Sequence, residues 1–280
     1  MKKISRRSFL AAAGLTVAAL ALTACGGSAS TASSAAASSV AASSEAASTS
    51  AAAAELTTVE AGKLTMATNA TFPPYEMTTD SGEFEGIDID TAKAIAEKLG
   101  LELQIDDMDF DAALLSVQQG KADIVMAGVT VTDERKAVMD FSDSYATGIQ
   151  SIIVPEGSDI TSPDDLAGKK IGTQRGTTGY IYCSDDFGED SVVAYDSGLT
   201  AVQALNNGQV DAVVIDNAPA TEYVAANPGL KVLDTSYAEE DYAIGMAKGS
   251  ALEDAVNKAL EELKADGTLQ AIVDKYINAN

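Results

Sequence analysis

The stretch LELQIDDMDFDAALLSVQQGKADIVM, residues 101–126, decides the fold class. Residues 101–105 alternate apolar and polar side chains as a strand does, and residues 122–126 are a short apolar run. The segment 111–119 between them is predicted to form a helix that ends at Gly120. A strand, a short helix and a second strand in this order indicate an α/β protein with parallel strands.

The same alternation continues on both sides of this stretch. A strand over 64–68 and a helix with apolar positions from Ile89 to Leu99 come before it. After it, a helix over 133–139 is followed by strands at 151–154, 170–173, 191–195, 212–215, 230–233 and 242–246, with helices between them. Two helices after Ser250 are expected to close the chain. Because the pattern starts over near residue 150, it favours two α/β lobes over one sheet.

The composition disfavours several classes of partner and site. Asp and Glu outnumber Lys and Arg by 42 to 18, which disfavours binding to nucleic acid or to an anionic lipid surface. There is no histidine and there are only two cysteines, which argues against a zinc site or other metal site and removes the commonest general base. No disulfide within the chain and no cofactor are expected.

The first residues resemble an export signal. Basic residues from Lys2 to Arg7 precede an apolar run over 9–24, as in a signal peptide that spans 1–24. The string Leu22-Thr-Ala-Cys25 resembles a bacterial lipobox, so we expect Cys25 to be lipidated, with an ordinary cleavage site as the alternative. The pair Arg6-Arg7 leaves the twin-arginine route open beside the general one.

The segment that follows is unlike a folded domain. Residues 26–57 are almost entirely Ala, Ser, Thr and Gly, without the large apolar side chains that offset the entropy lost on ordering. We therefore expect residues 25–57 to form a lipidated, disordered tether. The remaining residues, 58–280, are long enough for one large core or two small ones.

Polar residues that follow the predicted strands are the candidates for a binding site, because open α/β sheets bind ligands at the carboxyl ends of their strands. Arg135 lies in the first turn of its helix, where the helix dipole disfavours a cation. Its planar guanidinium suits a carboxylate ligand, while the alternative is an exposed arginine paired with Asp133 or Glu134. Thr130 and Thr178 lie near helix starts and offer further N–H groups.

An acid in the second half of the chain complements this cation. Asp216 follows a strand, where it either binds a ligand's ammonium group or caps the next helix. Phe72 and Phe110 also follow strands, and each either packs on a ligand or belongs to the core. Arg135 and Asp216 together would suit a zwitterion.

Five motifs resemble those of one family, the polar amino-acid-binding proteins of ABC importers, known as extracellular solute-binding protein family 3. The resemblance runs in order over nearly all of residues 60–280. The motifs are Ala67-Thr-Asn-Ala-Thr-Phe-Pro-Pro-Tyr75, Gly86-Ile-Asp-Ile-Asp90, Ala127-Gly-Val-Thr-Val-Thr-Asp-Glu-Arg-Lys136, Asp140-Phe-Ser142 and Gly176-Thr-Thr178.

The resemblance implies a type II periplasmic-binding-protein-like fold with two lobes and two hinge strands. Lobe one would comprise 58–149 and 243–280, and lobe two 150–242. The hinge strands would fall at about 150–154 and 241–245.

The resemblance also implies roles for the candidate residues. The ligand carboxylate would be held by Arg135 with Thr130 and Thr178, the ammonium by Asp216 and the Gly128 carbonyl, and the ligand side chain by Phe72 and Phe110. Asn69 is neutral where relatives that bind cationic side chains often carry an acid, and Gln174 is also neutral. This favours an uncharged polar amino acid, although Glu76 leaves a basic preference open.

The expected function is binding without catalysis. A monomer, tethered by the lipid on Cys25 to the outer face of the cell membrane, would capture a free amino acid and deliver it to an ABC permease. The alternatives are an enzyme of related fold, such as a dehydratase, and the ligand-sensing partner of a receptor.

Overall fold

The computed structural model describes residues 56–277. The predicted signal peptide, the lipidation of Cys25 and nearly all of the tether lie outside these residues. Within 56–277, no helix combines the length and the apolar character that crossing a bilayer requires.

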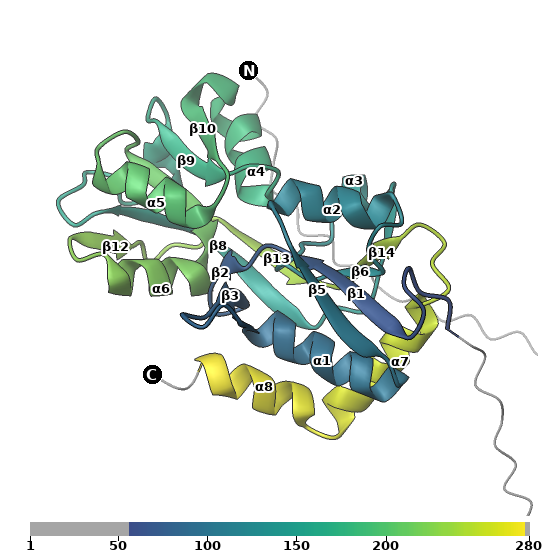
Figure 1. Cartoon of the computed structure of the whole chain (residues 1–280). Coiled ribbons are helices and arrows are strands. Elements are labelled where there is room, and N and C mark those ends of the chain that lie inside the picture. Colours follow the sequence, from purple (N-terminus) through teal and green to yellow (C-terminus); the bar gives the residue numbers. More distant parts are fainter. Residues whose placement is uncertain (1–55, 278–280) are drawn as a thin grey trace, which may run out of the picture. The chain divides into compact units, whose positions relative to one another are not determined.

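The first lobe is built on a five-stranded sheet with the order β5-β1-β6-β14-β7 (Figure 1). Its strand β1 pairs in parallel with β5 and β6, whereas β14 is antiparallel to both of its neighbours. The bounds of these strands are Lys63–Thr68 (β1), Glu102–Asp107 (β5), Ile124–Val125 (β6), Met139–Phe141 (β7) and Gly245–Ala247 (β14). A small antiparallel sheet beside it contains Thr71–Phe72 (β2), Glu76–Thr78 (β3) and Phe84–Glu85 (β4).

Helices cover both faces of the first sheet. In Figure 1, α1, α7 and α8 lie on one side of the sheet, and α2 and α3 lie on the other. Helix α7 packs with an apolar face inward, since Val256, Ala259, Leu260 and Leu263 recur at helical spacing and are buried. The helices are Ile87–Leu99 (α1), Phe110–Gln118 (α2), Asp133–Lys136 (α3), Glu253–Ala265 (α7) and Thr268–Ile277 (α8).

The second lobe contains a sheet with the order β10-β9-β11-β8-β12, and β13 pairs with β8. Strands β9, β10 and β11 are parallel, and β8 is antiparallel to β11, β12 and β13. The strands are Ala146–Pro155 (β8), Ile171–Gln174 (β9), Val192–Tyr195 (β10), Ala212–Asp216 (β11), Leu230–Val232 (β12) and Ala238–Tyr242 (β13). The helices are Thr178–Phe187 (α4), Gly198–Asn206 (α5) and Asn217–Ala226 (α6), with 3-10 turns at Pro163–Leu166 and Glu189–Ser191.

The chain passes between the two sheets at residues 142–145 and 243–244. These two segments pair with each other, because the N–H of Ser142 donates to the Ile244 carbonyl and the N–H of Tyr145 donates to the Tyr242 carbonyl, both at 2.9 Å. The residues expected for the first hinge strand, 150–154, lie inside β8. Their apolar run marks only the buried end of a strand that begins at Ala146. The expected lobe boundary at 149/150 also falls within β8.

Three further expectations need correction. The sheets are mixed rather than parallel, because the returning strands β8 and β14 run against their neighbours. The single strand expected over 242–246 is two strands, since the buried segment passes from one sheet to the other. The helix expected over 133–139 ends at Lys136, because Met139 already belongs to β7.

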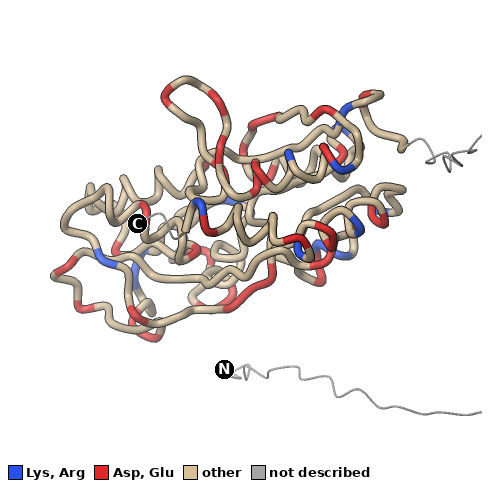
Figure 2. The backbone as a smooth tube through the Cα atoms, turned by 90° about the horizontal axis from the view of Figure 1, so that it is seen from below, with Lys and Arg blue, Asp and Glu red and all other residues tan. Residues whose placement is uncertain are grey.

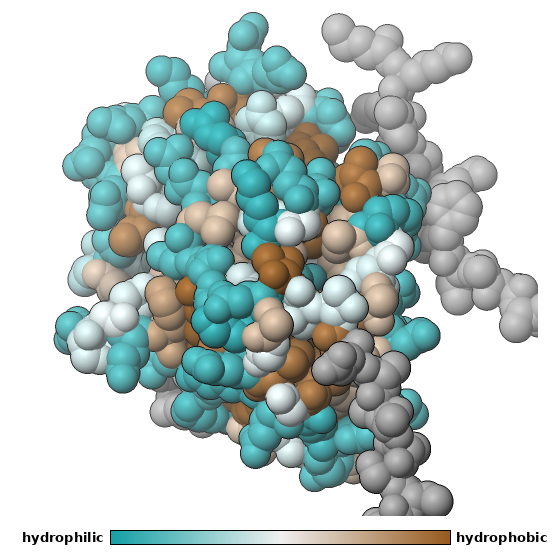
Figure 3. Space-filling view, turned by 45° about the vertical axis from the view of Figure 1, so that its right-hand side comes forward, coloured by the Kyte–Doolittle hydropathy of each residue, from teal (hydrophilic) through white to brown (hydrophobic). Residues whose placement is uncertain are grey.

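The surface of the described residues is polar and acidic. Figure 2 shows Asp and Glu on many separate segments of both lobes, with Lys and Arg sparser. On the face seen in Figure 3, apolar side chains form small groups among polar ones.

Candidate ligand-binding site

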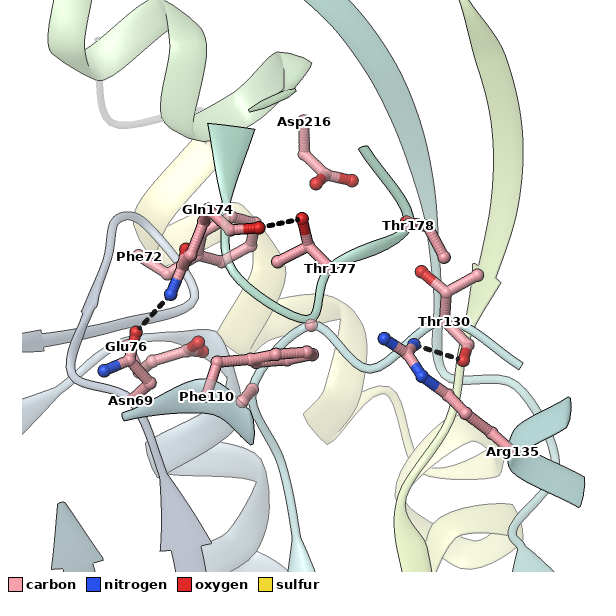
Figure 4. Close-up of a pocket in the computed structure, with 12 residues that line it drawn as sticks. Asn69, Phe72, Glu76, Phe110, Thr130, Arg135, Gln174, Thr177, Thr178 and Asp216 are labelled. Atoms are coloured by element: carbon pink, nitrogen blue, oxygen red, sulfur yellow. Dashed lines mark hydrogen bonds between the residues drawn. The ribbon is translucent and has the colours of Figure 1, made fainter. Parts of the chain in front are cut away.

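A cavity lies where the two lobes meet. All nine residues expected to bind a ligand line it, and Glu76, Ala127 and Thr177 join them (Figure 4). The nine are Asn69, Phe72, Phe110, Gly128, Thr130, Arg135, Gln174, Thr178 and Asp216.

Most of these residues meet because they follow or end a strand that points at the junction, while Arg135 lies in α3 and Thr178 begins α4. Asn69 follows β1, and Gly128 and Thr130 come shortly after β6. In the second lobe, Gln174 ends β9 and Asp216 ends β11. The carboxyl ends of both sets of parallel strands therefore face one cavity, as open α/β sheets predict.

Arg135 is buried in the cavity wall. Its side chain is held by two carbonyls, since Nη1 donates to Thr130 O at 2.7 Å and Nη2 donates to Gly176 O of the second lobe at 3.1 Å. Its guanidinium carbon lies 5.4 Å from the centre of the Phe110 ring. Burial lowers the pKa of Arg135. Because Arg135 is only 8% exposed and forms no ion pair within residues 56–277, the alternative of an exposed, paired arginine is wrong.

A guanidinium group carries five N–H donors, so this cation retains capacity for an anionic ligand. Thr132 fixes the base of the side chain, because its hydroxyl oxygen accepts a bond from the Arg135 N–H at 3.2 Å. The same bond makes Thr132 the N-cap of α3.

Asp216 lies at the opposite side of the cavity. It occupies the position that caps α6, yet its carboxylate makes no capping hydrogen bond. Instead Oδ2 accepts from Gln150 Nε2 at 2.8 Å, and Oδ1 accepts a short bond from the Tyr242 hydroxyl. Burial raises the pKa of Asp216 to about 7, and the bond from Tyr242 opposes that rise. A ligand ammonium group beside it would favour the ionised form.

Gly128 and Phe72 shape the wall between these charges. The backbone of Gly128 has φ of 56°, and a Cβ there would lie 2.8 Å from a ring carbon of Phe72. The Gly128 N–H donates to Asp88 Oδ2 at 3.0 Å, which holds this turn in place. Phe72 and Phe110 also belong to the hydrophobic core. Lining the cavity and belonging to the core are therefore compatible for both phenylalanines.

A buried glutamate, Glu240, connects the two threonines, and no pattern in the sequence marks it as a site residue. The hydroxyls of Thr130 and Thr178 donate to Glu240 Oε2 at 3.1 and 3.0 Å, and Gln150 Nε2 donates to the same oxygen at 2.9 Å. Thr178 begins α4 as expected, whereas Thr130 forms a bridge with Tyr242. Glu240 lies in an acidic run. It differs from its exposed neighbours only because side chains alternate along β13 and that of Glu240 points inward.

The two neutral side chains Asn69 and Gln174 bond to each other across the lobes. Gln174 Nε2 donates to Asn69 Oδ1 at 2.8 Å (Figure 4). Asn69 Nδ2 donates to the Met108 carbonyl at 2.8 Å, and the Asn69 oxygen also accepts from Thr71. The Asn69 amide is therefore largely occupied by the protein.

Glu76 lies on the same wall, beside Asn69 in Figure 4. It is fully buried, and no hydrogen-bond donor within the described residues reaches either of its carboxyl oxygens. Burial, with the nearby Asp88 carboxylate, raises the pKa of Glu76 well above its usual value. From the sequence, Glu76 serves only as an argument that the ligand could be a basic amino acid.

Known proteins share this fold and sequence pattern. The family model for bacterial extracellular solute-binding proteins, family 3, matches residues 64–279. A probable histidine-binding protein of Neisseria gonorrhoeae is 35% identical over 219 residues, which cover 75% of this chain and 81% of that protein.

Solved structures agree. An ancestral arginine-binding protein bound to arginine is 45% identical, with a TM-score of 0.73 over 77% of this chain and 98% of the other. The structure of an ancestral arginine-binding protein bound to glutamine is 44% identical, with the same TM-score and coverage. The two-lobed fold and the amino-acid-binding relationship expected from the sequence are confirmed, and the chain belongs to the bacterial extracellular solute-binding proteins of family 3.

Proposed function

We propose that this chain captures one free L-amino acid in the cavity between its lobes for delivery to an ABC importer. The observation that carries this is the opposition of Arg135 and Asp216 across one buried cavity. Among residues 56–277, Arg135 is a buried cation without a carboxylate partner, and Asp216 is a buried carboxylate without a cationic partner. Together they match the two charges of a zwitterion.

We propose a set of binding residues for each end of the ligand. The carboxylate would accept from Arg135 and from the backbone N–H groups near Thr130 and Thr178, whose hydroxyls are engaged by Glu240. The ammonium would donate to Asp216 and to the Gly128 carbonyl. Phe72 and Phe110 would pack against the aliphatic part of the side chain.

The ligand's side chain has two candidate chemistries. The neutral amides of Asn69 and Gln174 favour an uncharged polar amino acid, as the sequence suggested. A specific observation favours a cationic side chain: those amides bond to each other, whereas the buried Glu76 on the same wall has two oxygens without a donor. Relatives whose names specify histidine or arginine, and one structure with glutamine, fit this range of side chains.

The remaining parts of the proposal concern the whole chain. Lobe one would comprise 58–149 and 243–280 and lobe two 150–242, and a ligand that contacts both would stabilise their closed arrangement. The protein would act as a monomer and would not alter its ligand. Lipidation of Cys25 would hold it on the outer face of the cell membrane.

The test is a titration calorimetry series on amino acids and their truncated analogues. We expect an L-amino acid to bind, and both the matching amine without the carboxylate and the matching acid without the amino group to bind at least about a hundredfold more weakly. Equal affinity for the amine would contradict the role of Arg135, and equal affinity for the acid would contradict that of Asp216. Recovery of the ligand unchanged by mass spectrometry tests the absence of catalysis.

A further inference from the structure

Two buried carboxyl groups face each other behind the cavity wall. Glu76 begins β3 and Asp88 lies in the first turn of α1, and both side chains are 0% exposed. The two residues are neighbours, because the backbone N–H of Asp88 donates to the carbonyl of Tyr75, the residue before Glu76, at 2.9 Å. Burial raises the pKa of both carboxyl groups, that of Asp88 to about 6, and the Asp88 charge raises the pKa of Glu76 further. Neither carboxyl pairs with a Lys or Arg of residues 56–277.

The donors around this pair serve only one of its four oxygens. Asp88 Oδ2 accepts from the Gly128 N–H at 3.0 Å and from the Tyr145 hydroxyl at 2.8 Å. Asp88 Oδ1 and both Glu76 oxygens have no donor among the described residues. Two ionised carboxylates are acceptors only, so they would repel each other and leave three buried acceptors unsatisfied. One added proton removes the repulsion and supplies the missing donor.

The groups that face the pair give it no other counter-charge. They are Asp107 at the end of β5, Asp216 at the end of β11, and three buried tyrosines, Tyr75, Tyr145 and Tyr223. The one cation on the cavity wall, Arg135, is bound to the Thr130 and Gly176 carbonyls. Glu76 therefore stands among acids and phenols, with its carboxyl on the cavity wall.

We propose that Glu76 and Asp88 share one proton, that a cationic ligand side chain displaces this proton, and that a neutral amide side chain leaves it in place. The proton moves from the Glu76 carboxyl to solvent, and the ligand's positive charge replaces it beside the carboxylate. Asp88 acts as a positioning residue that holds the proton on Glu76 and, through the Gly128 N–H, holds the wall. The same cavity thereby serves both side-chain chemistries. This inference rests on the proposed function.

The test compares L-arginine and L-glutamine, which share an α-amino acid end and differ in side-chain charge. Calorimetry at one pH in buffers of different ionisation enthalpy counts the protons exchanged on binding. We expect L-arginine to release about one proton and L-glutamine about none. Release of equal numbers of protons by both ligands, or of none by L-arginine, would overturn the proposal.

Three substitutions refine the test. Glu76→Gln keeps the shape but removes the acid, so it should abolish the proton release and shift the affinity ratio toward L-glutamine by about tenfold or more. Asp88→Asn should shift that ratio toward L-arginine, because Glu76 then ionises more readily, and should reduce the proton release. Glu85→Gln is the matched control on the exposed strand β4 and should change neither quantity. Unchanged release in Glu76→Gln would refute the assignment to Glu76.

A spectroscopic measurement separates this inference from the proposed function. At pH 8, above the pKa of about 7 of Asp216, the infrared spectrum of the ligand-free protein should contain the band of a protonated carboxyl, and Glu76→Gln should lose it. If this band is present and no amino acid binds, the proposed function fails while the shared proton stands. If amino acids bind and the band is absent, both carboxyls are ionised and the shared proton is refuted.

Discussion

Arg135→Met should abolish most amino-acid binding with little loss of stability. Methionine keeps much of the apolar stem of arginine and removes the guanidinium group. The guanidinium is buried, without an ion pair within residues 56–277, and it lies on the cavity wall opposite Asp216. The substitution therefore deletes the only cation on that wall to which a ligand carboxylate could bond.

The magnitude follows from the contacts. A hydrogen bond from a charged group contributes about 1.5–3 kcal/mol, so the loss of two to a ligand carboxylate costs at least about 3 kcal/mol, or roughly 150-fold in Kd. In the ligand-free protein, the variant loses the bonds from the charged guanidinium to Thr130 O and Gly176 O, about 1.5 kcal/mol or more each, and the contact with the Phe110 ring. The removal of a buried cation offsets much of this loss. We expect the unfolding free energy to change by about 1 kcal/mol or less.

The assay pairs titration calorimetry with urea unfolding, and Arg175→Met is the control. Arg175 carries the same charge and precedes Gly176, whose carbonyl binds Arg135, but it is exposed and contacts the exposed Asp196 at 3.5 Å. A surface pair of this kind contributes about 0–1 kcal/mol, so this control should bind normally. Arg135→Met with wild-type affinity would refute the proposed carboxylate grip. Equal losses of affinity in both variants would show that the effect is one of net charge.

Two other predictions test the site's shape and its titration. Gly128→Ala places a Cβ against Phe72 at a left-handed backbone position, so it should lower the unfolding free energy by at least about 2 kcal/mol and the affinity by about tenfold. The control Gly120→Ala is also at a left-handed position but has nothing within 4 Å of the added Cβ, so it should lower the unfolding free energy by only about 1 kcal/mol and leave binding unchanged. Urea unfolding measures the stability of both variants, and calorimetry measures their affinity. Burial raises the pKa of Asp216 from 3.8 to about 7. Between these two pH values the folded protein therefore binds more protons than the unfolded chain does. The unfolding free energy of the ligand-free protein should consequently fall as the pH rises through this window. Asp216→Asn should make that fall shallower in urea unfolding measured from pH 4 to 8, and an unaltered slope would contradict the assignment to Asp216.

The residues that line the cavity could be predicted from the sequence because the ends of buried strands can be recognised in it. The end of a buried strand is marked by a change from apolar to polar side chains, as after Thr68 and at Asp216. The rule that parallel strands present ligands at their carboxyl ends then collects residues from both lobes. All nine of them line one cavity, although binding by them remains a prediction.

The direction in which each polar side chain points was not readable. Asn69 and Gln174 were expected to face the ligand as neutral groups, yet they bond to each other across the lobes. Glu240 looked like one acid in an exposed run, and only its place on β13 turns it inward toward the two threonines. A strand's phase and its cross-lobe partners depend on contacts between residues far apart in the chain, which one sequence does not specify.

The sequence by itself determined the α/β class, the two sets of strands and the pairing of one cation with one acid at strand ends. It did so because periodicity, glycine stops and helix caps are local properties of the chain. Only the tertiary structure decided that the sheets are mixed, where the chain crosses between them, and that Glu76 and Asp88 face each other without a counter-charge. Those features arise from packing, since burial and the approach of distant side chains fix which charges are solvated and which must find a partner.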